Sequence, residues 1–291
     1  MNAAKPQKIK NESYFISVWN EFRKNKAAVV GMVILLLIIF VAVFADKLAP
    51  YDPYEQVYAE ALQHPSSAHL FGTDEFGRDI FSRILYGARV SLLVGLVSVA
   101  IACVFGSILG ATAGYYGGAY DATMMRCMDI LLAIPSLLLN LAIVSALGKS
   151  TFNMMLAVGI SNIPRYCRIM RASVLQIKNA EYVEAARTTG ASSALIIMKH
   201  IIPNCLAPII VQATLSVGSA IIACAGLSFL GVGIPAPIPE WGAMLSNGKD
   251  FLRHNTYITI FPGLAIMLTV LSLNLMGDGL RDALDPKLKN S

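Results

Sequence analysis

The segment Ala27–Ala45 reads AAVVGMVILLLIIFVAVFA and carries no charged side chain. A helix needs about 20 consecutive apolar residues to cross the hydrocarbon core of a bilayer, so this segment predicts a membrane-spanning helix. The whole chain shares this character: 56% of its 291 residues are hydrophobic and 14% are charged, whereas soluble domains average about 25% charged residues. We therefore expect an all-helical (all-α) integral membrane protein without a water-soluble domain.

A cleaved signal peptide is the alternative interpretation of this first segment, since Val43-Phe44-Ala45 resembles a cleavage site. The apolar core of a signal peptide usually spans about 7–15 residues behind a short basic lead. The present run is longer and follows 26 residues, so we expect an uncleaved membrane anchor.

Further apolar segments raise the expected number of membrane spans to six. Prolines and glycines within them are tolerated because neighbouring helices satisfy the freed backbone groups. An even number of spans places both termini on one side of the membrane. The expected spans are Ala27–Ala45, Val90–Ala113, Ile130–Gly148, Phe152–Pro164, Cys205–Gly233 and Tyr257–Leu275.

Basic residues indicate which side that is, because loops rich in Lys and Arg stay in the cytoplasm. Sixteen of the 23 basic residues fall on one face of this topology, so both termini are expected to be cytoplasmic and the long segment 46–89 to lie outside. The net charge of +5 then reflects membrane orientation, and we expect no nucleic-acid partner. The sixteen are Lys5, Lys8, Lys10, Arg23, Lys24, Lys26, Arg126, Arg165, Arg168, Arg171, Lys178, Arg187, Lys199, Arg281, Lys287 and Lys289.

Disulfides, metals and cofactors are not expected. The five cysteines form no CxxC pair and fall in or beside spans, which argues against a disulfide framework. His64, His69 and 12 methionines are a weak signal for nickel, so we interpret the two histidines as exposed loop residues.

The segment 179–203 has the pattern of two short helices joined at a glycine. Asn179 is a candidate N-cap, Gly190 is suited to the left-handed turn that ends the first helix, and Pro203 is expected to stop the second. The segment reads Glu184-Ala185-Ala186, three residues, Gly190, then Pro203 after His200-Ile201-Ile202. This spacing resembles the EAA loop of binding-protein-dependent ABC importer permeases, although that family usually has Ile and Leu where His200 and Ile202 stand.

Other motifs resemble the dipeptide, oligopeptide and nickel branch of that family, most of all its C-type dipeptide permease subunits. The stretch Phe71–Asp79, with Gly72, Thr73, Asp74, Gly77, Arg78 and Asp79, is similar to the outer entrance segment of that branch. The stretches Leu227–Gly233, Pro239–Gly242 and Gly277–Pro286 are similar to its later signatures.

This resemblance implies a type I, MetI-like permease fold in a bacterial or archaeal cytoplasmic membrane. It implies an N-terminal unit, 1–88, before a five-helix permease core, 89–291, whose loop 179–203 docks on an ATPase. The expected partners are a second, homologous permease subunit, two cytoplasmic ATPase subunits and an external binding protein. Dipeptides, oligopeptides, glutathione-like peptides and nickel all stay open as solutes.

Gly106, Gly110 and Gly114 recur every four residues within one expected span. Such a row of small residues lets another helix backbone approach closely. We expect these glycines to form a helix-packing face.

Alternative functions have weaker signals. Gly148-Lys149-Ser150 resembles the end of a phosphate-binding loop, but Ile143 occupies the required glycine position, so ATP hydrolysis is expected on partner subunits. An intramembrane serine protease using Ser228 lacks a histidine at a matching depth, because His200 and His254 belong to loops on opposite sides. An ion-coupled carrier predicts ionisable residues deep in the spans, and the central stretches of five spans contain none.

Overall fold

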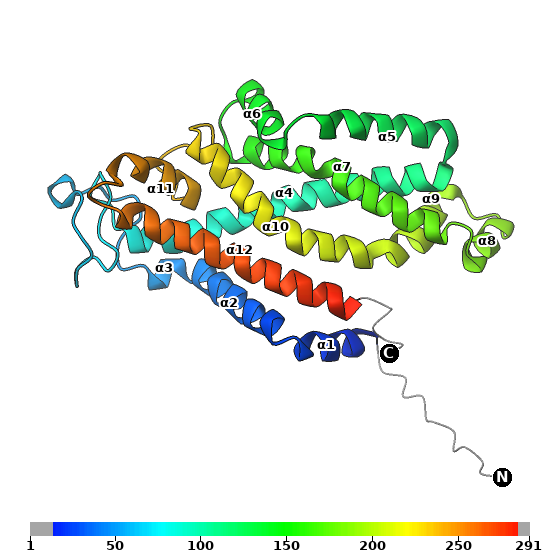
Figure 1. Cartoon of the computed structure of the whole chain (residues 1–291), viewed down its shortest axis with the longest axis horizontal. Coiled ribbons are helices and arrows are strands. Elements are labelled where there is room, and N and C mark those ends of the chain that lie inside the picture. Colours follow the sequence, from blue (N-terminus) through cyan, green and yellow to red (C-terminus); the bar gives the residue numbers. More distant parts are fainter. Residues whose placement is uncertain (1–13, 285–291) are drawn as a thin grey trace, which may run out of the picture.

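Helices make up most of the chain. The computed structural model describes residues 14–284, and no β-strand occurs within that range, which confirms the all-α prediction (Figure 1). Lys5, Lys8, Lys10, Asp285, Pro286, Lys287 and Lys289 lie outside the described residues.

The α-helices follow one another along the chain, joined by short turns and one long loop. They are α1 (Tyr14–Lys24), α2 (Lys26–Val43), α3 (Ala45–Leu48), α4 (Ile80–Tyr116), α5 (Gly118–Ala133), α6 (Ser136–Leu147), α7 (Thr151–Ile177), α8 (Glu181–Thr188), α9 (Ser193–Ile196), α10 (Leu206–Phe229), α11 (Trp241–Gly248) and α12 (Tyr257–Leu284). Shorter helical turns are η1 (Tyr58–Glu60), η2 (Ile197–Ile201), η3 (Ile202–Cys205) and η4 (Lys249–Phe251).

Four helical runs within residues 14–284 are long and apolar enough to cross a bilayer. They are α2, α4, the run Ser193–Phe229 that ends in α10, and α12. The pair α5–α6 has the length and composition of a fifth, but a bend of 91° separates its two helices. Four of the six expected spans thus correspond to single helical runs with these properties.

The third expected span, Ile130–Gly148, is not one continuous helix, because the chain bends between α5 and α6. Ile134 has extended backbone angles, as the residue before a proline prefers, and Pro135 begins a new helix direction. The helix α6 has 12 residues, about 18 Å, and is too short to cross a bilayer alone.

The fourth expected span, Phe152–Pro164, lies within the longer helix α7, which continues through the arginines that were expected to end it. Arg171 donates to both carboxylate oxygens of Asp121 at 2.5 and 2.6 Å, and Arg168 donates to Asp129 at 2.5 Å. Both acids belong to α5, so a second helix supplies opposite charges to two of the three arginines of α7, a helix of 27 residues.

The second helix of segment 179–203 is not a separate unit. From α9 the chain continues through the π-helical turn η2 and the 3-10 turn η3 into α10. Pro203 lies at the start of η3, where the missing N–H is tolerated. The prediction that Pro203 stops this helix is therefore wrong.

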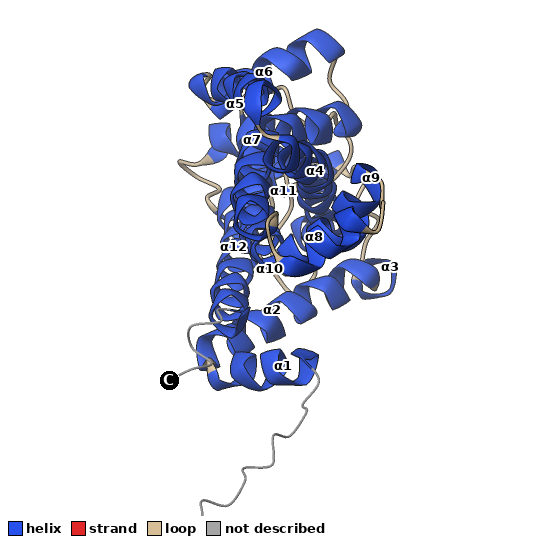
Figure 2. Cartoon of the chain, turned by 90° about the vertical axis from the view of Figure 1, so that its right-hand side faces the viewer, coloured by secondary structure: helices blue, strands red, loops and turns tan. Residues whose placement is uncertain are grey.

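The long helices run side by side, so the molecule has two distinct ends. One end carries α1, α8, α9 and the last turns of α12, and the other carries α3, α11 and the loop 49–79 (Figure 1). We call these the α8 end and the α11 end. Seen from the α8 end, the long helices appear nearly end-on (Figure 2).

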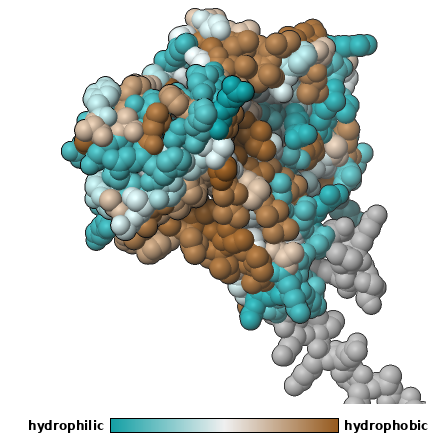
Figure 3. Space-filling model, turned by 60° about the vertical axis from the view of Figure 1, so that its left-hand side comes forward, coloured by the Kyte–Doolittle hydropathy of each residue, from teal (hydrophilic) through white to brown (hydrophobic). Residues whose placement is uncertain are grey.

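Large apolar side chains cover the sides of the molecule between these ends. Exposed examples are Leu37 on α2, Leu96 on α4, Ile222 on α10 and Met267 on α12. Figure 3 shows this hydrophobic area as a broad brown region between hydrophilic surfaces. Such a large apolar surface is stable against lipid rather than water, which agrees with a membrane protein.

The helix α4 is the central element of the bundle. It has 37 residues, about 55 Å, and packs against α7, α10 and α2. It also runs across position 88, where the sequence analysis placed a unit boundary. That division stays a prediction.

The glycines of α4 lie against α7. A Cβ added at Gly106 would lie 2.5 Å from the Cβ of Tyr166, and one added at Gly114 would lie 3.0 Å from that of Val174. A Cβ at Gly110 would overlap the carbonyl oxygen of Cys167. The two helices are therefore too close for a side chain at Gly106 or Gly110, and they leave only a tight fit at Gly114.

We expect Gly110→Ala to destabilise the bundle by about 1–3 kcal/mol, because overpacking forces the helix backbones apart, and Gly110→Leu to do so more strongly. The matched control is Gly226→Ala on α10, where nothing lies within 4 Å of an added Cβ. Melting midpoint and the yield of monodisperse protein measure the effect. Wild-type values for both Gly110 variants would contradict the packing.

Candidate functional site

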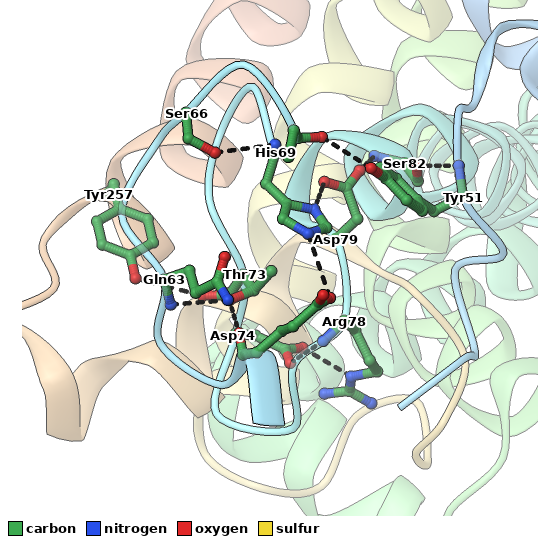
Figure 4. Close-up of polar contacts among 12 residues, drawn as sticks. Tyr51, Gln63, Ser66, His69, Thr73, Asp74, Arg78, Asp79, Ser82 and Tyr257 are labelled. Atoms are coloured by element: carbon green, nitrogen blue, oxygen red, sulfur yellow. Dashed lines mark hydrogen bonds and ion pairs between the residues drawn. The ribbon is translucent and has the colours of Figure 1, made fainter. Parts of the chain in front are cut away.

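The loop 49–79 at the α11 end is a compact structure held by its own polar groups. Asp74 accepts hydrogen bonds from the backbone N–H groups of Phe76 and Arg78 at 2.9 and 3.0 Å, and from Nε of Arg78 at 2.7 Å. Thr73 donates to the carbonyl of Glu60 at 2.5 Å and accepts from the N–H of Gln63 at 2.9 Å. Figure 4 shows the contact of Gln63 with Thr73 and that of Asp74 with Arg78.

Gly72 and Gly77 permit these turns. Their φ angles are +78° and +75°, a region that other residues rarely adopt. A Cβ at Gly77 would also overlap the backbone of Val57, and one at Gly72 would lie 2.5 Å from the carbonyl oxygen of Gln63. Both glycines are therefore required by conformation and by space.

Asp79 joins this loop to α4. It is the N-cap of that helix, and its Oδ2 accepts from the N–H of Ser82 at 2.8 Å. Its Oδ1 lies 3.0 Å from Nδ1 of His69. His69 is only 4% exposed, so the interpretation of both histidines as exposed loop residues is wrong for His69 and holds for His64.

Two buried arginines share the carboxylate of Asp74. Nε of Arg78 lies 2.7 Å, and Nε of Arg83 3.6 Å, from Oδ2 of Asp74. Glu75 lies nearby, 3.9 Å from Arg78, and burial raises the pKa of its carboxyl group. Within residues 14–284 no group of three potential ligand side chains is arranged for a metal ion.

The helix α8 at the opposite end is closed by a Schellman motif. The N–H of Gly190 donates to Arg187 and the N–H of Ala191 to Ala186, both at 3.1 Å, which is the hydrogen-bond pattern of that motif. Gly190 has φ +83° and open space around it. Glycine is therefore favoured at this position by the left-handed backbone conformation and not by a lack of space for a side chain.

Asn179 does not cap this helix, contrary to the sequence-based expectation. Ala180 is the N-cap residue and provides no side-chain hydrogen bond. Asn179 lies in the turn that leaves α7, one residue too early for the cap. Glu181 and Glu184 occupy the first turn, where carboxylates interact favourably with the helix dipole.

One face of α8 packs on the bundle and the other is free. Val183 is fully buried, while Glu184 and Ala185 are exposed and Ala186 is half-buried. Tyr182, and Leu195 and Met198 in the following turns, expose 42%, 48% and 62% of their surface. These side chains expose apolar area at a polar end of the molecule.

The alternative functional motifs have structural explanations. Gly148 ends α6 and Ser150 caps α7, so Gly148-Lys149-Ser150 is a turn between helices. Oγ of Ser228 is buried without a hydrogen-bond partner among residues 14–284, and hence no described base activates it.

Several contacts were not predicted. The Arg171–Asp121 and Arg168–Asp129 pairs join α7 to α5, and only the opposite charges of these segments hinted at them. Glu240 caps α11 by accepting from the N–H groups of Gly242 and Ala243 at 2.8 Å. A glutamate before Trp241-Gly242 is a weak capping signal, which explains why it was missed.

Two family models match this chain. The model described as binding-protein-dependent transport system inner membrane component matches residues 106–290, more than half of the chain. The model described as N-terminal TM domain of oligopeptide transport permease C matches residues 13–65.

Similar proteins agree with these matches. The dipeptide transport system permease protein DppC of Alkalihalophilus pseudofirmus is 49% identical over 279 residues, 94% of this chain and 92% of the relative. The glutathione transport system permease protein GsiD of Pectobacterium atrosepticum is 45% identical over 273 residues, 94% of this chain and 91% of the relative.

A solved structure shows the same fold. A chain of the MetNI methionine ABC transporter, in an inward-facing conformation, matches with a TM-score of 0.56 and 17% identity over 70% of this chain and 97% of that chain. The expected MetI-like permease fold is thus confirmed. With the family matches, this fold and the long apolar helices, the chain belongs to the binding-protein-dependent transport system inner membrane components, the membrane-embedded permease subunits of ABC transporters.

Proposed function

We propose that this chain forms half of the translocation pathway of an ABC importer for dipeptides and short oligopeptides. A dipeptide permease that is 49% identical over nearly the whole chain supports the peptide substrate. The glutathione permease at 45% identity keeps a glutathione-like peptide as the second candidate, and nickel has less support.

The main support for this proposal is the exposed surface of α8 and of the turns that follow it. Tyr182, Leu195 and Met198 expose apolar area at the end of the molecule where the charged residues of α1 and α12 also lie. Apolar side chains outside the lipid-facing sides are suited to a protein partner. The partner proposed here is a cytoplasmic ATPase subunit, which binds segment 179–203 through Glu184, Ala185, Ala186 and the turn at Gly190.

The remaining partners follow from the same proposal. A second, homologous permease completes the pathway as a heterodimer, a second ATPase binds that permease, and an external binding protein delivers the peptide to the α11 end. Because the full sequence has no intact phosphate-binding loop, ATP is hydrolysed by the partners.

Orientation is part of the proposal. The α8 end carries Arg23, Lys24, Arg187 and Arg281, so the positive-inside rule favours a cytoplasmic α8 end with both termini inside. The N-terminal unit, 1–88, then places α1 at the cytoplasmic surface and the loop 49–79 outside, ahead of the permease core.

Thiol labelling tests this orientation. An engineered Ser67→Cys is expected to react with a membrane-impermeant reagent added outside intact cells, and Thr189→Cys only after the membrane is opened. Both native side chains are exposed, which makes the two positions a matched pair. Labelling of Ser67→Cys from the cytoplasmic side alone would overturn the orientation.

The coupling role is tested at Gly190. Valine in a left-handed conformation costs about 1–2 kcal/mol or more, so Gly190→Val is expected to distort the end of α8 and reduce both ATPase association and uptake in membranes that contain the whole complex. Gly190→Asn is the control, because asparagine tolerates this conformation and the site has space for it.

Both Gly190 variants are expected to insert their membrane-spanning helices as the wild type does, since α8 lies outside the apolar runs. Normal uptake by Gly190→Val with the ATPases still bound would show that the turn at Gly190 has no coupling role. Equal losses of uptake and of ATPase association in the two variants would show the same.

A further inference from the structure

A cavity opens at the α11 end of the molecule. It has a volume of about 310 Å³ and lies between the start of α4, the turn between α6 and α7, the outer end of α10 and α11. The loop that joins α10 to α11 lines it with small and apolar residues, among them Gly231, Gly233 and Ala236. Its size is at the lower end of the range for small-molecule sites, about 300–1,000 Å³.

Positive charge dominates this cavity. Arg78, Arg83 and Lys149 line it, and its described lining includes no acidic side chain. Asp74 and Glu75 instead line a separate, much smaller recess that also touches both arginines. The carboxylates therefore hold the guanidinium groups on one side, while the cavity lies on the other.

The two arginines are held in place with donors to spare. A guanidinium has five N–H donors; hydrogen bonds to Asp74 and to the carbonyl of Pro53 engage one donor of Arg78 and one of Arg83. The guanidinium of Arg78 also lies 4.6 Å from the ring centre of Phe76. Fixed guanidinium groups of this kind are suited to bidentate binding of a carboxylate.

Ser228 adds an independent observation. It lines the cavity and is 4% exposed, and its Oγ forms no hydrogen bond within residues 14–284. Leaving a buried hydroxyl unpaired costs about 1–3 kcal/mol. This Oγ lies against Gly233, another residue of the cavity wall, so a hydrogen-bond partner that reached this wall would be favourable.

We propose that this cavity binds the carboxylate of the transported peptide where the peptide enters from the external side. The identification of the ligand as a peptide rests on the proposed import function. The negative charge of the bound group is inferred from the basic side chains of the cavity. Arg78 and Arg83 are only 2% and 3% exposed, so a small group that enters the cavity reaches them whereas a flat protein surface does not. Lys149, which is exposed, attracts the anion at the rim.

The first experiment tests the charge without any transport assay. Asn247 is exposed and lines the cavity, whereas none of the five native cysteines does. In right-side-out vesicles with the whole complex, Asn247→Cys is expected to react about fivefold faster with an anionic methanethiosulfonate reagent than with its cationic analogue, relative to free cysteine. Adding Lys149→Gln is expected to reduce that ratio. Equal rates, or no reaction from outside, would overturn the proposal.

The second experiment tests the ligand group. Dialanine at millimolar concentration is expected to slow labelling of Asn247→Cys, and dialanine amide, which lacks the carboxylate, is expected to have no effect. Equal protection by the two would overturn the assignment of the carboxylate. The complex could also import no dipeptide while the charge-selective labelling and its suppression by dialanine persist. That result would contradict the proposed import function but support the binding site.

Uptake distinguishes a solute site from a docking contact. At saturating loaded binding protein, Lys149→Glu is expected to lower dipeptide uptake about fivefold, Lys149→Arg to restore it, and the control Lys47→Glu, another exposed lysine at this end, to leave it unchanged. A Lys149→Glu complex that reaches normal maximal uptake and needs only more binding protein would show a docking contact instead and contradict the proposal.

Discussion

The close packing of α4 against α7 is the contact on which the rest of the structure depends. In a bilayer the lipid tails are as apolar as the side chains, so helices associate through tight packing and polar contacts rather than through the hydrophobic effect. Gly106, Gly110 and Gly114 remove the side chains that would separate these helices. The ion pairs from Arg168 and Arg171 then join α7 to α5 as well.

Both ends with a proposed function are attached to this helix pair. At the α11 end, Asp79 caps α4 and fixes the loop 49–79, while the residue before the N-cap of α7 is Lys149. At the α8 end, the guanidinium of Arg187 lies 5.6 Å from the ring centre of Tyr115 in the last turn of α4, and α8 follows α7 after a short turn. In the proposed mechanism, the pair α4 and α7 connects the ATPase-binding end to the basic cavity, so that a movement of α8 would reach the cavity along these helices, as alternating access between two conformations requires.

Sequence patterns predicted those features that depend on local chemistry. The uncharged run Ala27–Ala45 indicated a membrane helix because length and hydropathy alone decide it, and the left-handed Gly190 followed from the rule for helix ends. The bend at Pro135 was missed because membrane helices often accommodate a proline, and only the packing around it decides between a kink and a break. The burial of His69 and the convergence of Arg78, Arg83 and Ser228 depend on residues far apart in the chain, which no local pattern contains.

We propose that the α8 surface contacts an ATPase while the loop 49–79 faces the external binding protein. Photo-crosslinking in the whole complex tests it most directly, with benzoylphenylalanine placed at Tyr182 or at Tyr58, both exposed aromatic positions at opposite ends of the molecule. We expect an adduct with the ATPase from position 182 and an adduct with the binding protein from position 58. An ATPase adduct from position 58, or a binding-protein adduct from position 182, would contradict it.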